Sequence, residues 1–157
     1  MTVRAEQILD AISARILAEI GASGVAVYTH RRLSLQVAPN EPAVSVDFGP
    51  EDVIEEANAE VYVAMTVMTT VNVAADEEAT VRSELLRLGR EVWQAVMTGY
   101  TAGMPFSLSF GLAFVEIVNP GGASEPQIDV GTEYVVGART HSWRVTYKHS
   151  LADPGDG

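Results

Sequence analysis

Residues 61–73 read VYVAMTVMTTVNV, and this stretch decides the fold. Its odd positions are Val or Met apart from Thr69, while its even positions are Tyr, Ala, Thr, Met, Thr and Asn. Such alternation predicts a strand that buries one face. Thirteen extended residues span about 43 Å at ~3.3 Å each, whereas strands usually have about 3 to 10 residues. We therefore expect this strand to bend, or to project beyond the core as one arm of a hairpin.

Two other stretches have the spacing of amphipathic helices. In residues 3–20 isoleucine recurs every four positions, and Gly21 ends the pattern. In residues 76–97, Asp76 is the expected N-cap and acids fill the first turn, where the helix dipole favours them. The residues expected to be buried there are Val81, Leu85, Leu88, Val92 and Val96. The two tryptophans, Trp93 and Trp143, lie on apolar faces and are assigned to the core.

Four shorter strands are expected around the long one, at residues 25–31, 44–48, 112–118 and 142–148. Residues 49–60, GPEDVIEEANAE, hold five acids and little β-propensity, so they are predicted to form a loop. A second, Gly-rich loop is predicted at 119–131. The order shows no regular β-α-β alternation. It predicts an α+β fold, a mostly antiparallel sheet of four to five strands with two main helices packed on one face.

The composition suits a single folded domain. The chain has 157 residues, with 47% apolar and 20% charged. We assign residues 1–151 to the domain and 152–157 to a mobile C-terminal tail. The absence of cysteine excludes disulfides and thiolate chemistry. No apolar run approaches the ~18 residues that a membrane-spanning helix needs, and the N-terminus does not resemble a signal peptide.

Negative charge is concentrated in one part of the sequence. Ten basic and 21 acidic residues give a net charge of −11, and residues 41–78 hold ten of the acids and no Lys or Arg. Phosphate contacts need clustered cations. This block therefore disfavours tight binding to the outside of DNA, and it suits a surface that repels nucleic acid.

Little in the sequence points to catalysis. The phosphate-binding, zinc-protease and nucleophile-elbow motifs are all missing. His141 and His149 lie about 26 Å apart along one predicted strand, too far to share a metal ion, although His30 is free to approach one of them. We predict that the chain is not an enzyme and that it has no cofactor, catalytic or metal site.

Two groups of charged residues remain as candidates for contacts with partners. The first is the basic pair Arg31 and Arg32, whose forked donors suit phosphate or carboxylate, although the pair also fits the solvated end of a strand. The second is the acidic group in 49–60, which lacks the spacing of a calcium loop and fits a solvated acidic segment. Its members are Glu51, Asp52, Glu55 and Glu56.

The arrangement as a whole is similar to that of a known family. A helix leads into a strand, and a second strand contains PAVSV at residues 42–46. An acidic segment, the long strand and the acid-led helix follow, and the chain closes with SWRVTYK at residues 142–148. Over most of its length this order resembles the lambda-type minor tail protein U family, the tail terminators of siphophages. The segment 119–131 departs from that compact pattern.

The resemblance implies an α+β protomer that assembles with itself into a hexameric ring on the end of the tail tube. Such a ring stops polymerisation of the tube protein and presents a surface to the head–tail connector protein, while DNA passes through without specific binding. The implied location is the virion tail, assembled in the host cytoplasm, with no membrane partner. The acids at 49–60 would line the passage or dock onto a basic partner surface.

Two alternatives remain open. One is another head–tail joining or tail-completion protein, and the other is a small α+β ligand-binding domain or enzyme. A well-formed apolar pocket with converging polar groups would favour the second alternative. An exposed apolar patch beside an acidic face would favour assembly.

Overall fold

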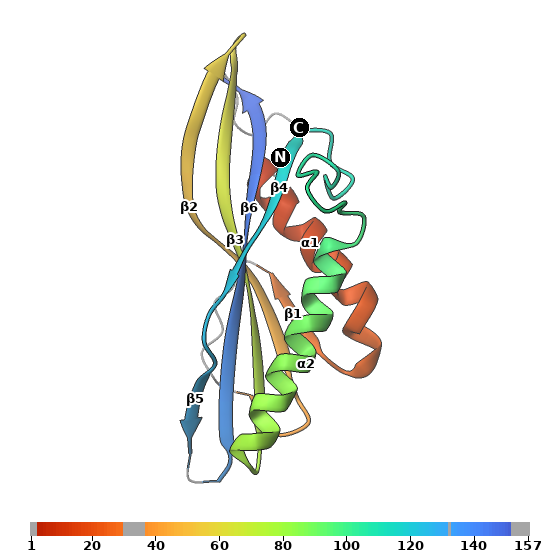
Figure 1. Cartoon of the computed structure of the whole chain (residues 1–157), viewed down its shortest axis with the longest axis vertical. Coiled ribbons are helices and arrows are strands. Elements are labelled where there is room, and N and C mark those ends of the chain that lie inside the picture. The colour runs from red at the N-terminus through yellow and green to blue at the C-terminus, as the bar shows by residue number, and fades with distance from the viewer. Residues whose placement is uncertain (1–2, 30–36, 132, 152–157) are drawn as a thin grey trace.

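The computed structural model describes residues 3–29, 37–131 and 133–151 (Figure 1). Its elements are, in chain order, α1 (Arg4–Ile20), the 3₁₀ turn η1 (Gly21–Ser23), β1 (Ala26–Thr29), β2 (Ala43–Ala57), β3 (Glu60–Ala75), α2 (Glu78–Met97), β4 (Val115–Ala123), β5 (Gln127–Val130) and β6 (Val135–Ser150). The candidates Arg31 and Arg32, together with His30 and the predicted tail at 152–157, lie outside the described residues.

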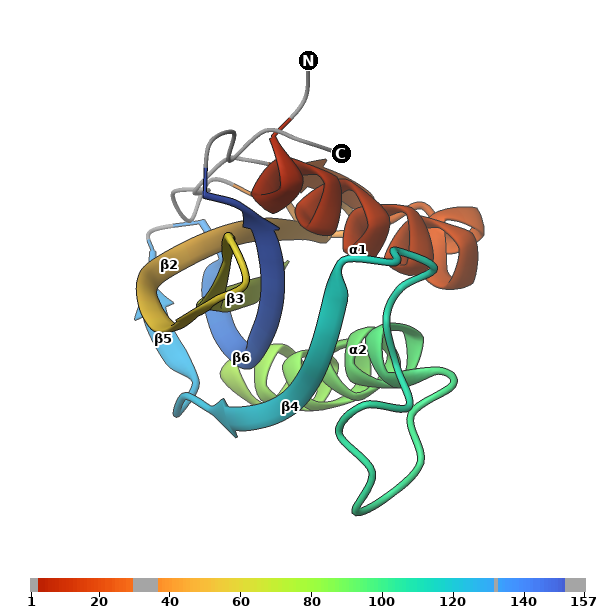
Figure 2. The same cartoon turned by 90° about the horizontal axis from the view of Figure 1, so that it is seen from above.

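The strands form one six-stranded sheet in the order β1-β2-β3-β6-β4, with β5 also paired to β6. β1 runs parallel to β2, and the other pairs are antiparallel. Both helices lie on one face of this sheet (Figures 1 and 2). The predicted α+β fold, with a mostly antiparallel sheet and two helices on one face, is confirmed. Among the described helices none is long and apolar enough to cross a membrane.

The central strand is β3. All of its 16 residues pair with β6, from Glu60 opposite Ser150 to Ala75 opposite Val135. On its other side β3 pairs with β2 along most of its length. The odd positions from 61 to 73, Thr69 included, are all buried. The alternation in the sequence therefore identified the core-facing side of β3 correctly.

The helices pack with the faces that their sequences predict. α1 buries all four isoleucines of its stripe, and α2 buries all five residues predicted for it. Arg15 of α1 donates hydrogen bonds to the carbonyls of Val96, at 3.2 Å, and Thr98, at 2.6 Å. These bonds join the helices and satisfy carbonyls at the C-terminal end of α2. The N-cap of α2 is Glu77 rather than Asp76, because Glu77 is still in an extended conformation.

Both predicted loops are wrong. Within 49–60, β2 continues as far as Ala57, because the backbone of β3 offers it hydrogen-bond partners and this pairing outweighs the weak β-propensity of the acids. Within 119–131, β4 runs to Ala123 and β5 follows, and both pair with β6. β5 is the strand beyond the four to five predicted, and β4 begins at Val115 rather than at residue 112.

Gly137 marks a close approach of α2 to the sheet. A Cβ atom at this position would lie 2.5 Å from Val81 Cγ1 and 2.9 Å from Leu85 Cδ1. Both of these side chains are fully buried in α2. At the other end of α2, Trp143 of β6 is buried as predicted and donates its indole N–H to Met97 Sδ at 3.2 Å. A side chain at 137 would therefore push α2 away from β6.

We expect Gly137→Ala to destabilise the protein by about 1–3 kcal/mol, because the added methyl overpacks the contact between α2 and β6. Thermal and urea unfolding measure the effect, which corresponds to roughly 2–4 °C in Tm per kcal/mol for a chain of this size. The control is Gly122→Ala, since no atom lies within 4 Å of a Cβ at that site. Equal stability of the two variants would contradict the packing described here.

Candidate functional site

The outer parts of β2 and β3 extend past both helices and form one end of the molecule (Figure 1). β1 pairs with β2 only from Ala43 to Val46, so beyond Val46 the edge of β2 that faces away from β3 has no strand beside it among the described residues. We call residues 49–65 the acidic arm. β2 and β3 are joined as a hairpin here, so of the two expectations for the long strand, a bend or one arm of a hairpin, the structure shows the hairpin, although Val61, Val63 and Met65 are still buried in the core.

A two-residue turn closes the arm. Ala57 pairs with Glu60, which leaves Asn58 and Ala59 as the loop. Their φ angles are +53° and +64°, as a type I′ turn requires, and this turn matches the twist of the flanking strands. Asn tolerates the left-handed conformation, but Ala pays a steric cost there because of its Cβ. The turn therefore has favourable geometry and one unfavourable residue.

The register divides the four candidate acids between the two faces of the arm. Glu51 and Glu56 pair with odd-numbered residues of β3, so they lie on the face toward the helices. Asp52 and Glu55 pair with even-numbered residues and lie on the opposite face. All four side chains are exposed. The structure thus brings the predicted acids together on one strand, but they do not form a single carboxylate cluster.

Few cations compensate the charge of the arm. Glu51 Oε1 accepts a hydrogen bond from the Tyr147 hydroxyl at 3.3 Å. A carboxylate oxygen of Asp52 lies 3.9 Å from a guanidinium nitrogen of Arg144, and the side chains of Asp52 and Arg144 are both exposed. Within the described part of the chain, Glu55 and Glu56 have neither an ion pair nor a hydrogen bond from their side chains. The negative charge is therefore least compensated toward the tip.

Two apolar side chains are exposed among these acids. Val53 is 63% exposed and Ile54 is 51% exposed. Ile54 lies at a bulge, since the register shifts between Val53 and Glu55, and Pro50 lies at another register shift, between Phe48 and Glu51. Neither residue was predicted to be part of an exposed surface. In the sequence Val53 and Ile54 are two β-branched residues between two pairs of acids, and β-branched residues favour a strand over a loop.

The remaining polar groups give little sign of a reactive centre. In the described ranges no three His, Asp or Glu side chains are placed to hold a metal ion. His141 packs against Gly89 of α2 and stacks on Trp143, with ring centroids 6.2 Å apart. Burial, with a smaller contribution from the charge of Arg139, lowers the pKa of His141. This histidine therefore belongs to the packing between α2 and the sheet.

Comparisons with known proteins give matches among solved structures. Neither the family models nor the curated protein sequences contain a match to this chain. Among solved structures, the chain is similar to one in a structure described as "Virion of native gene transfer agent (GTA) particle". The two are 14% identical, the similarity covers 90% of this chain and 95% of that one, and the TM-score is 0.48. A similarity of this degree does not establish a shared function.

We expect Ala59→Gly to stabilise the arm by roughly 0.5–1 kcal/mol, because glycine removes the steric cost at positive φ, less its own entropic cost. Amide hydrogen exchange measures this stabilisation, because the backbone amides that pair β2 with β3 should exchange more slowly in the variant. The control is Ala57→Gly, which lies within the strand and should speed exchange of the same amides. Unchanged exchange in Ala59→Gly would argue against the hairpin turn.

We expect the Tyr147 phenol to ionise at a higher pH than an exposed tyrosine. Its pKa is raised above the ordinary value of about 10, first by burial and then by the charge and hydrogen bond of Glu51. With a raised pKa in the folded state, its contribution to stability is complete below pH ~10 and is lost as pH rises above that value.

Alkaline titration followed by tyrosine absorbance, together with unfolding at several pH values, measures this effect. Tyr147→Phe should remove the late-titrating phenol and flatten the fall in stability above pH ~10. Tyr28→Phe is the matched control and should leave the late titration in place. Ionisation of all phenols in one step near pH ~10 would contradict the burial of Tyr147 against Glu51.

Proposed function

We propose that this chain is a structural virion protein without catalytic activity, and specifically a tail terminator. In this role, copies of the chain form a ring, which we take to be a hexamer, on the end of the tail tube. The ring stops polymerisation of the tube protein and presents the surface that the head–tail connector protein joins. DNA passes through the ring without specific binding.

The acidic arm is the observation that carries this proposal. It extends beyond the part of the sheet that the helices cover (Figure 1), and one edge of β2 has no neighbouring strand among the described residues. Its bulges and Pro50 weaken that edge as a template for random strand pairing. Exposed Val53 and Ile54 beside uncompensated carboxylates give it the composition of a contact surface. Its β3 side buries Val61, Val63 and Met65 in the core, so the part that suits contact with a neighbouring protein is the exposed β2 side.

The distribution of charge supports the part of the proposal that concerns DNA. Carboxylates lie on both faces of the arm, so either face presents negative charge to its surroundings. Repeating the arm around a ring would multiply this charge near the axis. Phosphates are repelled by such a surface, and DNA would then move past it without being held.

We expect reversal of Glu51, Asp52, Glu55 and Glu56 to lysine to impair assembly while the fold stays intact. The yield of infectious particles should fall by at least about tenfold, since reversed charges at a contact change both its affinity and its rate of formation. Light scattering and negative-stain imaging measure ring formation, in solution and on purified tail tubes. Circular dichroism and thermal unfolding check the fold.

The matched control reverses four exposed acids elsewhere, namely Glu19, Glu41, Glu125 and Asp129, which gives the same change in net charge. This control should assemble normally if the arm itself makes the contact. Normal infectious particles from the arm variant would sink the proposal. A strict monomer that also fails to cap tail tubes, in the unmodified protein, would overturn the terminator assignment.

A further inference from the structure

The outward side of α2 has an unusual composition for a solvated helix face. Leu86, Arg90 and Trp93 are spaced by four and three residues, so they share one side of the helix, which lies beside the buried stripe. Leu86 is 55% exposed and Trp93 is 40% exposed. The assignment of Trp93 to the core is therefore wrong. Trp93 belongs with Leu86 to a second group of apolar residues on α2, and this group is exposed to solvent.

Arg90 is the cation of this surface that has no ion pair with any other described residue. Arg82 is paired with Glu78 at 2.9 Å, and Arg87 is paired with Glu84 at 2.6 Å and with Glu91 at 3.1 Å. Arg90 is exposed, and no side chain in the described part of the structure forms an ion pair with it. A shallow groove lies along the same side of the helix, lined by Leu86, Arg87, Arg90, Glu91 and Gln94.

We infer that the acidic arm of one copy docks on this outward face of α2 in a second copy. The inference rests on the proposed function and names the two surfaces that would join protomers in the ring. Val53 and Ile54 supply apolar surface to cover Leu86 and Trp93. Glu55 and Glu56, which have no ion pair with the described residues, lie beside Val53 and Ile54 and complement the charge of Arg90.

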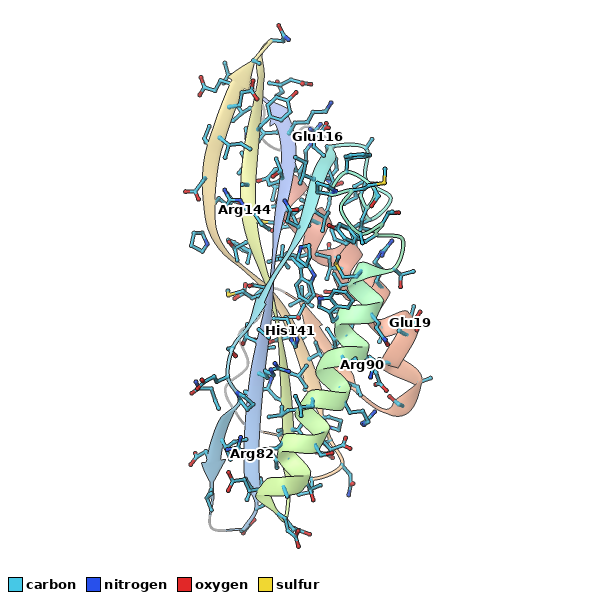
Figure 3. The ribbon with its side chains drawn as sticks, viewed as in Figure 1. Glu19, Arg82, Arg90, Glu116, His141 and Arg144 are labelled. Carbon is cyan, nitrogen blue, oxygen red and sulfur yellow. The ribbon has the colours of Figure 1, made fainter. Side chains whose placement is uncertain are left out.

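The two surfaces do not meet within one chain. The arm forms one end of the molecule, whereas α2 runs along the other half, where Arg90 is labelled (Figures 1 and 3). A contact between two different surfaces of identical chains is heterologous, and it closes into a ring when the rotation between copies permits. Trp and Arg are also the residue types that contribute most often to the energetic centres of protein interfaces.

The other possible occupants fit the observations less well. An added β-strand on the edge of β2 would meet two bulges and a proline, which interrupt regular pairing. A basic partner of another kind would account for the carboxylates of the arm. It would leave Leu86, Arg90 and Trp93 exposed on every copy. A second copy of this chain satisfies both surfaces at once.

The absence of cysteine from the chain allows a specific cross-linking test. We expect protein carrying Ile54→Cys, mixed with protein carrying Gln94→Cys, to form covalent dimers with a short bismaleimide under conditions of assembly. Such a reagent tolerates more separation than a disulfide, which needs Cα atoms within about 7 Å. The control pair combines Ile54→Cys with Leu17→Cys, which is an exposed site on α1 as Gln94 is on α2, and it should give few dimers.

A charge exchange tests the same contact without cross-linking. Arg90→Glu should weaken self-association by about tenfold or more, since it places like charges at the contact. Combining Arg90→Glu with Glu55→Lys and Glu56→Lys should restore most of the lost affinity. Sedimentation across concentration measures the association, and negative-stain images show the species formed.

The outcomes separate this inference from the proposed function. Selective cross-linking through residues 54 and 94, with rescue by the charge exchange, supports it. Rings that form normally in Arg90→Glu and give no selective cross-link overturn the inference and leave the terminator role standing. Unmodified protein that neither self-associates nor caps tail tubes overturns both.

Discussion

The structure depends on the pairing of β3 with strands on both of its sides. Each residue of β3 pairs with β6, and most pair with β2, so its backbone polar groups are satisfied far beyond the region that the helices cover. This full-length pairing lets the sheet continue past the helices. Without it, a segment as acidic as 49–60 would have little reason to adopt an extended conformation. The acidic arm is thus a consequence of β3 and its partners more than of its own residues.

The features that the sequence predicted well are those set by periodicity within one element. The alternation in 61–73 and the stripes of both helices each report which side of a single element is buried, and no partner is needed to interpret them. The features that it predicted poorly depend on partners. Residues 49–57 and β5 are strands because neighbours pair with them. Trp93 is exposed because α2 has a second apolar side that nothing in the described chain covers.

The candidate site was predictable in part for the same reason. The acids Glu51, Asp52, Glu55 and Glu56 stand out in the sequence by their density alone. Their division between two faces follows from a register that includes two shifts, and no local pattern in the sequence encodes those shifts. The exposure of Val53 and Ile54 follows from the length of the arm relative to the helices. The sequence thus indicated where charge gathers, while the tertiary pairing decided which way each side chain points.

The same bulges that complicate the register also limit how copies of the chain can associate. An open, regular edge invites strand pairing that repeats without end, and such pairing leads to fibres rather than closed assemblies. In β2 the edge carries acids, Pro50 and two register shifts, so this route is disfavoured. A contact made through side chains, between an arm and a helix face, fixes one rotation between neighbours instead. Since a heterologous contact closes only at particular rotations, a rigid contact of this kind suits a ring of defined size better than a flexible or edge-to-edge one.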